Sequence, residues 1–122
     1  MSLRHSTVKS FSYAFQGIKL ALKNEPNFRI HILLAIVSIA LGIILDLSVL
    51  EISILTLTIG FVIILELLNT TIEALVDLVS PQIKPKAKIA KDVAAASVLF
   101  SAILAVCVGV FLFLPKILEK LQ

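Results

Sequence analysis

Four polar residues on one apolar stretch have the types and spacing that a catalytic site needs. Glu66, Asn69, Glu73 and Asp77 follow one another at steps of three, four and four residues. In a helix, these steps place all four side chains on one face. Three carboxylates on one stripe repel each other, so a divalent metal or a facing lysine is expected to stabilise them. Carboxylates and water are the natural ligands of Mg²⁺, which usually also binds substrate phosphates.

Three further charged residues are expected at the same level of the molecule. A hydrocarbon core of about 30 Å takes roughly 20 residues of helix, which places its boundary near Asn69. Glu25 precedes the first apolar run, and Lys91 and Asp92 precede the last one. The sequence therefore predicts a polar layer at the membrane boundary. Its members are Glu25, Glu66, Asn69, Glu73, Asp77, Lys91 and Asp92.

An ordinary solvated rim would explain part of this layer, because charges at a membrane boundary are in contact with water. That reading accounts for Asp77 and Asp92. It accounts poorly for Glu66, which has apolar residues 61–65 before it and Leu67 and Leu68 after it. Ionisable groups near membrane depth are functional candidates by default. Phosphoryl transfer needs a base near the attacking hydroxyl, and Glu66, the carboxylate nearest the lipid, fits that role.

The composition indicates which elements must position these residues. The chain has 122 residues, of which 59% are apolar and 16% charged. A soluble domain of this size could not hide so much apolar surface from water. We therefore expect an all-α membrane protein with one domain over residues 1–122. Its predicted spans are residues 28–45, 50–79 and 93–114, with Asn24 capping the first and Pro115 closing the third.

An amphipathic helix is predicted ahead of the spans, over residues 6–23. Phe11, Phe15, Ile18 and Leu22 recur at steps of four, three and four, and the lysines of this segment follow another face. A basic stripe opposite an apolar stripe suits a helix that lies in the headgroup layer. Packing of this helix on the spans is the alternative, and both arrangements can hold at once.

The basic residues predict the orientation. In a three-span arrangement, nine of them lie on one side of the membrane and two, Lys116 and Lys120, lie on the other. This excess predicts that the N-terminus and the loop at 80–92 face the cytoplasm and that the C-terminus lies outside. The nine are Arg4, Lys9, Lys19, Lys23, Arg29, Lys84, Lys86, Lys88 and Lys91.

Other motifs are scarce. The sequence holds no Walker A motif and no GxGxxG, and its one cysteine, Cys107, leaves no disulfide to form. Gly60 and Gly109 are expected to serve helix contact. Two rival functions stay open: an ion-coupled transporter subunit that uses Glu66, and a structural membrane protein or assembly factor. The grouping of several carboxylates at one boundary disfavours the transporter, which usually keeps a lone carboxylate near mid-membrane.

Three blocks of residues resemble a known family. Residues 66–77, ELLNTTIEALVD, resemble the E-x-x-N-[ST]-x-x-E-x-x-x-D signature of the prokaryotic diacylglycerol kinases and undecaprenol kinases. Residues 90–92, Ala-Lys-Asp, match the second block of that family. The first block is matched by Asn24-Glu25 followed by Phe28-Arg29. The resemblance runs from about residue 9 to residue 114.

This resemblance implies a homotrimeric lipid kinase with MgATP as donor and with active sites shared between neighbouring subunits. By motif, Glu66 corresponds to the general base, and Glu25 and Glu73 to the metal ligands. Asp77 would orient Lys91. The residues that the resemblance assigns to the nucleotide and its phosphates are Tyr13, Glu25, Asn69, Glu73, Asp77, Lys91 and Asp92.

The match departs from the family in one loop, where many members have an E-Y-H-P-like stretch and this chain has QIKP at 82–85. Lys84 remains available there for a phosphate. Two stretches are similar to those of Gram-positive undecaprenol kinases: FRIH at 28–31 and FLPK at 113–116. This similarity favours undecaprenol as the substrate, with diacylglycerol as the alternative. The predicted substrate contacts are Lys19, Phe28, Arg29, His31 and Glu66, with the active site on the cytoplasmic side of the cell inner membrane.

Overall fold

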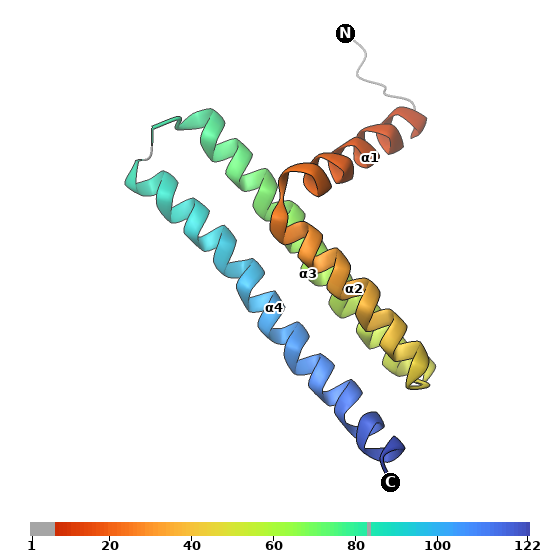
Figure 1. Cartoon of the computed structure of the whole chain (residues 1–122). Helices are drawn as coiled ribbons and strands as arrows, with labels where there is room; N and C mark the ends of the chain where they lie inside the picture. Colours follow the sequence, from red (N-terminus) through yellow and green to blue (C-terminus); the bar gives the residue numbers. More distant parts are fainter. Residues whose placement is uncertain (1–6, 83) are drawn as a thin grey trace.

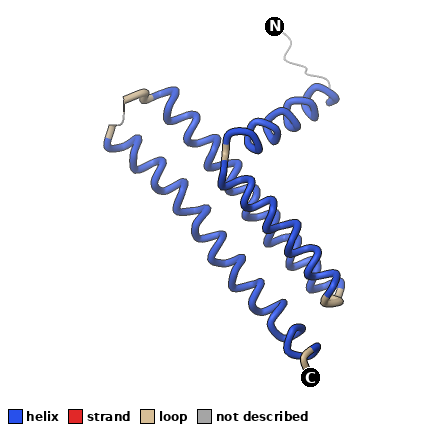
Figure 2. Tube along the Cα trace, viewed as in Figure 1, coloured by secondary structure: helices blue, strands red, loops and turns tan. Residues whose placement is uncertain are grey.

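The computed structural model describes residues 7–82 and 84–122, and every regular element in them is a helix (Figure 2). The order is α1 (Thr7–Asn24), α2 (Pro26–Ile44), α3 (Val49–Val79) and α4 (Pro85–Lys120). Residue 6 of the expected first helix, Arg4 of the charge count and residue 83 of the expected loop lie outside the described residues. The all-α prediction is confirmed for the described part of the chain.

Helices α2, α3 and α4 run side by side, and α1 projects away from them at a steep angle (Figure 1). α3 packs against both α2 and α4. All three long helices are long and apolar enough to cross a membrane, as predicted. In their most apolar windows, only 11–17% of the residues are buried. The remaining apolar surface therefore needs a cover outside the chain, which lipid or a further protein chain supplies.

The break between α1 and α2 differs from the predicted cap. Asn24 is the last residue of α1, and Glu25 is the N-cap residue of α2, with φ −105° and ψ 105° and no side-chain cap bond. The following residue, Pro26, explains this, because proline disfavours helical geometry in the residue before it and is itself well placed in a first turn. The carboxylate of Glu25 is therefore fixed at a bend in the chain.

The turn between α2 and α3 is short and well determined. Asp46 adopts a positive φ of 54°. Ser48 and Glu51 form a capping box, in which Ser48 Oγ accepts from the Glu51 backbone N–H and the Glu51 carboxylate accepts from the Ser48 N–H at 2.7 Å. Gly42 permits the close approach of the turn and of α3, because an added Cβ would lie 3.0 Å from Leu47 Cδ1 and 3.2 Å from Ile52 Cδ1.

Two glycines that we expected at helix contacts do not make them within the chain. A Cβ at Gly60 would meet nothing within 4 Å, and one at Gly109 would meet only Phe113 of its own helix. Both glycines lie in apolar stretches, where periodicity alone does not distinguish a face turned to a neighbouring helix from one turned outward. The contact between α2 and α3 depends on Gly42 instead.

The last helix is longer than predicted at both ends. It begins at Pro85, so the connection after α3 is shorter than the expected loop at 80–92, and it continues through Pro115 to Lys120. A proline removes a single backbone hydrogen bond, and helices in apolar surroundings tolerate it. Contacts beyond Pro115 hold the final turns: Lys116 pairs with Glu51 at 3.7 Å, and Lys120 reaches across to the α2–α3 turn.

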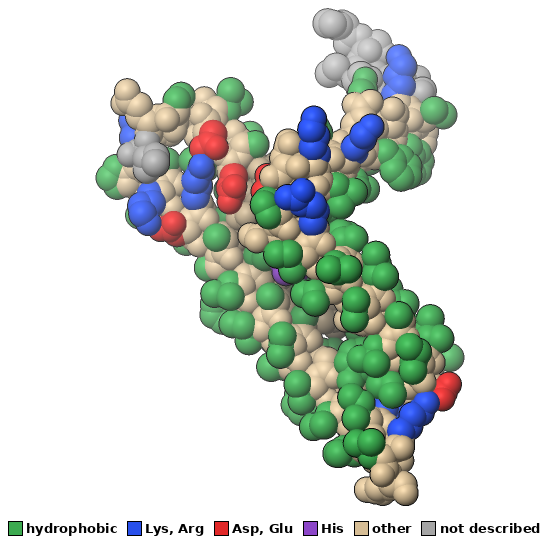
Figure 3. Space-filling view, viewed as in Figure 1, with side chains coloured by type: hydrophobic (Ala, Val, Ile, Leu, Met, Phe, Trp, Pro, Cys, Tyr) green, Lys and Arg blue, Asp and Glu red, His purple; other side chains and the backbone are tan. Residues whose placement is uncertain are grey.

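These contacts form a cluster at one end of the three long helices, which we call the end clasp: Asp46, Glu51, Lys116 and Lys120. Lys120 Nζ lies 3.2 Å from Asp46 Oδ2 and donates to the Ile44 carbonyl at 2.8 Å. Charged side chains gather there and at the opposite end, with apolar side chains between them (Figure 3). The end clasp thus ties α4 to the turn that joins α2 and α3.

The capping box makes a testable contribution to stability. We expect Ser48→Ala to lower the free energy of unfolding by about 1 kcal/mol, because the first turn of α3 loses an acceptor for a backbone N–H. Unfolding in mixed detergent would measure the change. Ser53→Ala is the matched control, because its hydroxyl donates only to the Val49 carbonyl of the same helix. Equal effects of the two substitutions would contradict the role of the box.

Candidate active site

Glu66 is the most deeply buried charged residue of the site. Its side chain lies on α3 and is 2% exposed, among the most buried of the described residues, together with Phe28 of α2 and Ser101 of α4. α4 turns a small-residue face, including Ala94, Val98 and Ser101, toward this helix pair. Small side chains let helices approach closely. The packing of the three helices therefore encloses a carboxylate that the sequence alone placed at a boundary.

Three ionisable side chains act electrostatically on this carboxylate. His31 of α2, Glu25 at the bend before α2 and Glu73 of α3 all lie close enough to act on the charge of Glu66. Glu25 therefore acts on the charge of the α3 acidic face of its own chain. Two like charges and one imidazole beside a buried carboxylate form an environment in which proton affinity and cation binding are linked.

The rest of the acidic face continues along α3 toward the loop. Asn69 donates from Nδ2 to Glu73 Oε1 at 3.1 Å. One turn further, Asp77 Oδ1 lies 2.5 Å from Lys91 Nζ of α4, and Glu73 is also close enough to act on Lys91. The ion pair joins the two residues that the resemblance linked. A lysine is thus held beside the carboxylates, as the repulsion between them required.

The donor set suits a hard cation. Asn69 Oδ1 is a buried acceptor for which no hydrogen-bond partner is found among the described residues, and the Glu73 carboxylate is bonded to the same amide. Oxygen donors of this kind are those that Mg²⁺ prefers. Within residues 7–82 and 84–122, no cluster of three or more His, Cys, Asp or Glu side chains forms a metal site by itself. Mg²⁺ bound by Glu25 and Glu73 would therefore need further oxygens from water or phosphate.

Other predicted residues lie further from this centre. Asp92 forms an ion pair with Lys88 on the exposed side of α4, a partner that its spacing of four residues signals in the sequence and that we did not predict. Lys84 is the exposed N-cap residue of α4. Tyr13 and Lys19 lie on α1, the helix that projects away from the other three (Figure 1), and Arg29 is exposed near the start of α2. Of these residues, Asp92 lines a small hollow together with Asp77 and Lys91.

A hollow of about 670 Å³ separates α1 from α3 beside the site. Glu25 and Asn24 lie at one edge, Gly17 and Ala21 come from α1, and α3 contributes Thr70 among others. Thr70 donates its hydroxyl to the Glu66 backbone carbonyl at 3.1 Å, so its polar group is satisfied within α3 at the level of the site. The hollow gives the Glu25 side of the site an approach between the two helices.

Together, the fold and the site define a small α-helical membrane protein with a carboxylate centre near one end of its spans. Comparison with known proteins is specific. The pattern of the family described as prokaryotic diacylglycerol kinase matches residues 12–113. The chain belongs to this family, and the matched range includes every residue of the site.

The names of individual relatives divide between two activities. A diacylglycerol kinase of Synechocystis sp. is 46% identical over 111 residues, 90% of this chain but 63% of that protein. An undecaprenol kinase of Bacillus subtilis is 41% identical over 109 residues, 89% of both chains. A diacylglycerol kinase of Escherichia coli is 30% identical over 99 residues, 81% of both.

The burial of Glu66 indicates that its carboxylate lowers the free energy of unfolding of the protein. Its side chain is 2% exposed, and taking a carboxylate out of water costs free energy. We expect Glu66→Leu to raise the free energy of unfolding by about 1–3 kcal/mol. Reversible unfolding in mixed detergent would measure this.

Glu73→Leu is the matched control on the same helix face. Glu73 is only half-buried and accepts a hydrogen bond from Asn69, so its replacement is expected to give no gain. A Glu66→Leu protein less stable than the wild type would show that unseen partners hold the Glu66 carboxylate.

Proposed function

We propose that this protein is a lipid kinase that transfers the γ-phosphate of MgATP to the hydroxyl of a membrane lipid, with undecaprenol as the substrate and diacylglycerol as the alternative. Membership of the prokaryotic diacylglycerol kinase family supports a phosphotransferase that acts on a lipid. The observation that carries the proposal is the burial of Glu66 beside His31, Glu25 and Glu73. A lipid hydroxyl and a water-borne phosphate can meet at such a place.

Each polar residue has a role in this reaction. Glu66 accepts the proton of the lipid hydroxyl as its oxygen attacks the γ-phosphorus, and ADP leaves. Lys91, held by Asp77, offsets the charge of the phosphates. Glu25 and Glu73 bind Mg²⁺, which would neutralise phosphate charge, and Asn69 adds an oxygen donor. Tyr13, Lys84 and Asp92 contact the nucleotide, and Lys19, Arg29 and His31 contact the lipid. Phe28, which the sequence also predicted as a lipid contact, is only 1% exposed and packs between the helices instead.

Undecaprenol is favoured over diacylglycerol by residues 28–31 and 113–116, as argued from the sequence. The Bacillus subtilis relative, aligned over 89% of both chains, is named undecaprenol kinase, which supports the same choice. The Synechocystis relative, named diacylglycerol kinase, is more similar by identity and supports the alternative. A side-by-side assay with undecaprenol and diacylglycerol in mixed micelles, with labelled ATP, separates the two.

The membrane arrangement follows from charge and exposure. We infer that the protein lies in the cell inner membrane with the N-terminus and the active site in the cytoplasm, because basic residues concentrate at that end. Helix α1 lies in the headgroup layer, since Phe11 and Phe15 are 64% and 69% exposed and its lysines follow another face of the helix. Three such chains form a homotrimer, whose contacts cover the apolar faces that one chain leaves open.

Glu66→Gln is expected to lower the turnover of lipid phosphorylation by about 10²–10⁴-fold, because the amide cannot accept the proton. The measurement is transfer of label from ATP to undecaprenol and to diacylglycerol. Glu51→Gln, in the end clasp, is the matched control and is expected to keep activity. If Glu66→Gln retains activity, Glu66 is not the base. If the wild-type protein produces no labelled lipid from either substrate, the proposed kinase activity itself is wrong.

Sharing of sites between subunits has its own test. Two inactive variants, Glu66→Gln and Lys91→Met, would be unfolded, mixed and refolded together. If each site takes Glu66 from one subunit and Lys91 from its neighbour, the mixture regains part of the wild-type activity, since some sites then hold both native residues. If a mixture that still forms trimers regains no activity, both residues of each site come from one chain.

A further inference from the structure

Two polar side chains are buried in the described part of the chain, Glu66 of α3 and Ser101 of α4, and each is 2% exposed. The other buried side chains of residues 7–82 and 84–122 are apolar. Polar groups are seldom buried without a partner, because removing them from water costs free energy. A serine that is buried as completely as the proposed base, on a helix that packs against the same helix, therefore needs an explanation.

The contacts between α3 and α4 place Ser101 opposite Glu66. The two helices run antiparallel (Figure 1), and an ion pair joins them near each end. Glu66 comes fifteen residues after Glu51, and Ser101 comes fifteen residues before its partner, Lys116. Counting in the same way from the other ion pair leads to Ala102, the next residue of α4. Because all α-helices rise by the same length per residue, Glu66 and Ser101 lie at one level of the bundle.

Phe28 of α2 belongs to the same level. A Cβ added at Gly42 would lie 3.2 Å from Ile52 Cδ1, which fixes the register of α2 and α3 near their turn. Phe28 comes fourteen residues before Gly42, and Glu66 comes fourteen residues after Ile52. Phe28 is 1% exposed, so the most buried side chain of each long helix lies in this layer. Glu66 is thus placed between an aromatic ring of α2 and a hydroxyl of α4.

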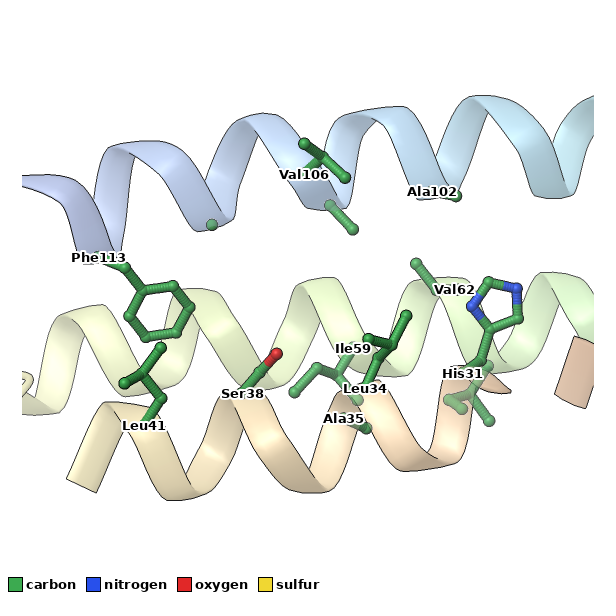
Figure 4. A pocket seen from close by; sticks show the side chains of 13 residues that line it. His31, Leu34, Ala35, Ser38, Leu41, Ile59, Val62, Ala102, Val106 and Phe113 are labelled. Carbon is green, nitrogen blue, oxygen red and sulfur yellow. The ribbon is translucent and has the colours of Figure 1, made fainter. Parts of the chain in front are cut away.

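An apolar groove of about 360 Å³ begins beside this layer and continues between α2 and α4, with α3 next to it (Figure 4). Its lining includes Ala102, the neighbour of Ser101, and His31 points into it near Val62, one helical turn before Glu66. Apart from His31 and Ser38, the lining residues are apolar. From this side, therefore, few groups compete with Ser101 as a hydrogen-bond partner for Glu66.

The hydroxyl of Ser101 is oriented by its own helix. Ser101 Oγ donates to the Val98 carbonyl at 2.7 Å. With its proton engaged there, the oxygen still has lone pairs and can accept a hydrogen bond. An ionised carboxylate has no proton to donate, whereas a protonated carboxyl group has one. The hydroxyl is therefore suited to Glu66 after the carboxylate has taken up a proton.

We propose that Ser101 is a positioning residue for Glu66, because its Oγ accepts a hydrogen bond from the Glu66 carboxyl group once that group is protonated. The inference rests on the proposed function. The lipid oxygen forms its bond to the γ-phosphorus, the bond from phosphorus to ADP breaks, and the hydroxyl proton passes to Glu66. The new O–H bond then points to Ser101, and the proton is released to water after the products leave.

Ser101→Ala tests this role, because it removes the hydroxyl and keeps the small size that close helix packing needs. We expect kcat for lipid phosphorylation to fall by about three- to tenfold with the KM for the lipid unchanged, since the lost bond forms only as the proton is transferred. Ser97→Ala is the matched control and should keep the wild-type kcat. Ser97 also donates to a carbonyl of its own helix, that of Ala94 at 2.7 Å, but its side chain is exposed.

A double substitution distinguishes this role from a packing role. When Glu66 is already replaced in Glu66→Gln, adding Ser101→Ala should change the residual kcat by less than about twofold, because no carboxyl group remains to be stabilised. A further fall as large as that seen in the wild-type background would show that Ser101 acts through packing and would overturn the proposal. An unchanged kcat in Ser101→Ala alone would overturn it as well.

Infrared spectroscopy tests the hydrogen bond without catalysis. Acidification of the wild-type protein should produce a carboxyl stretching band that is missing from Glu66→Gln. This band should move to higher frequency in Ser101→Ala, because hydrogen bonding lowers the stretching frequency of a carboxyl group, and it should stay in place in Ser97→Ala.

The outcomes separate the two proposals. A band that does not move in Ser101→Ala would overturn the role of Ser101 and leave the kinase intact. A band that moves in a protein that phosphorylates no lipid would reject only the kinase. If Glu66→Gln removes no band, Glu66 does not take up a proton, and both proposals are wrong.

Discussion

The structure depends on one constraint: an acidic side chain has to be kept among apolar helices without losing access to water-borne partners. Glu66 meets it by lying where α2, α3 and α4 pack together, near the end of the bundle that carries Glu73, Asp77 and Lys91. Two turns further into the apolar stretch, the desolvation cost would rise steeply. If the carboxylate lay two turns nearer to the end of α3, it would be solvated, and water would compete with its binding partners. The position along α3 is therefore as informative as the residue type.

The helices satisfy this constraint through side-chain size rather than through specific polar contacts. α4 approaches α3 through Ala94, Val98 and Ser101, and α2 approaches α3 through Gly42. Between helices without a strong hydrophobic drive, such close packing is the main source of attraction. Other small side chains, among them Ala35 of α2 and Ala102 of α4, leave the groove between α2 and α4 open, so one feature of composition produces both the contact and the space beside it.

The sequence predicted the elements well and their mutual arrangement only in part. Hydropathy located the three long helices, and helical spacing grouped Glu66, Asn69, Glu73 and Asp77 on one face. Helix ends were less predictable: Pro115 reads as a stop, but Lys116 and Lys120 hold the last turns by contacts with residues far away in the sequence. The burial of Glu66 and the groove beside His31 depend on how three helices pack, which no periodicity within a single helix encodes.

The distribution of ion pairs has a mechanical consequence for α2. Helix α4 is tied to α3 by Asp77–Lys91 toward one end and by Glu51–Lys116 at the other. Helix α2 is tied by its short turn and by the bond from Lys120 to the Ile44 carbonyl, and in residues 7–82 and 84–122 no ion pair anchors its opposite half. Ion pairs and the turn therefore hold α2 at one end only. The other end of α2 carries Glu25 and His31, and the packing of Phe28 determines how rigidly these two residues are held.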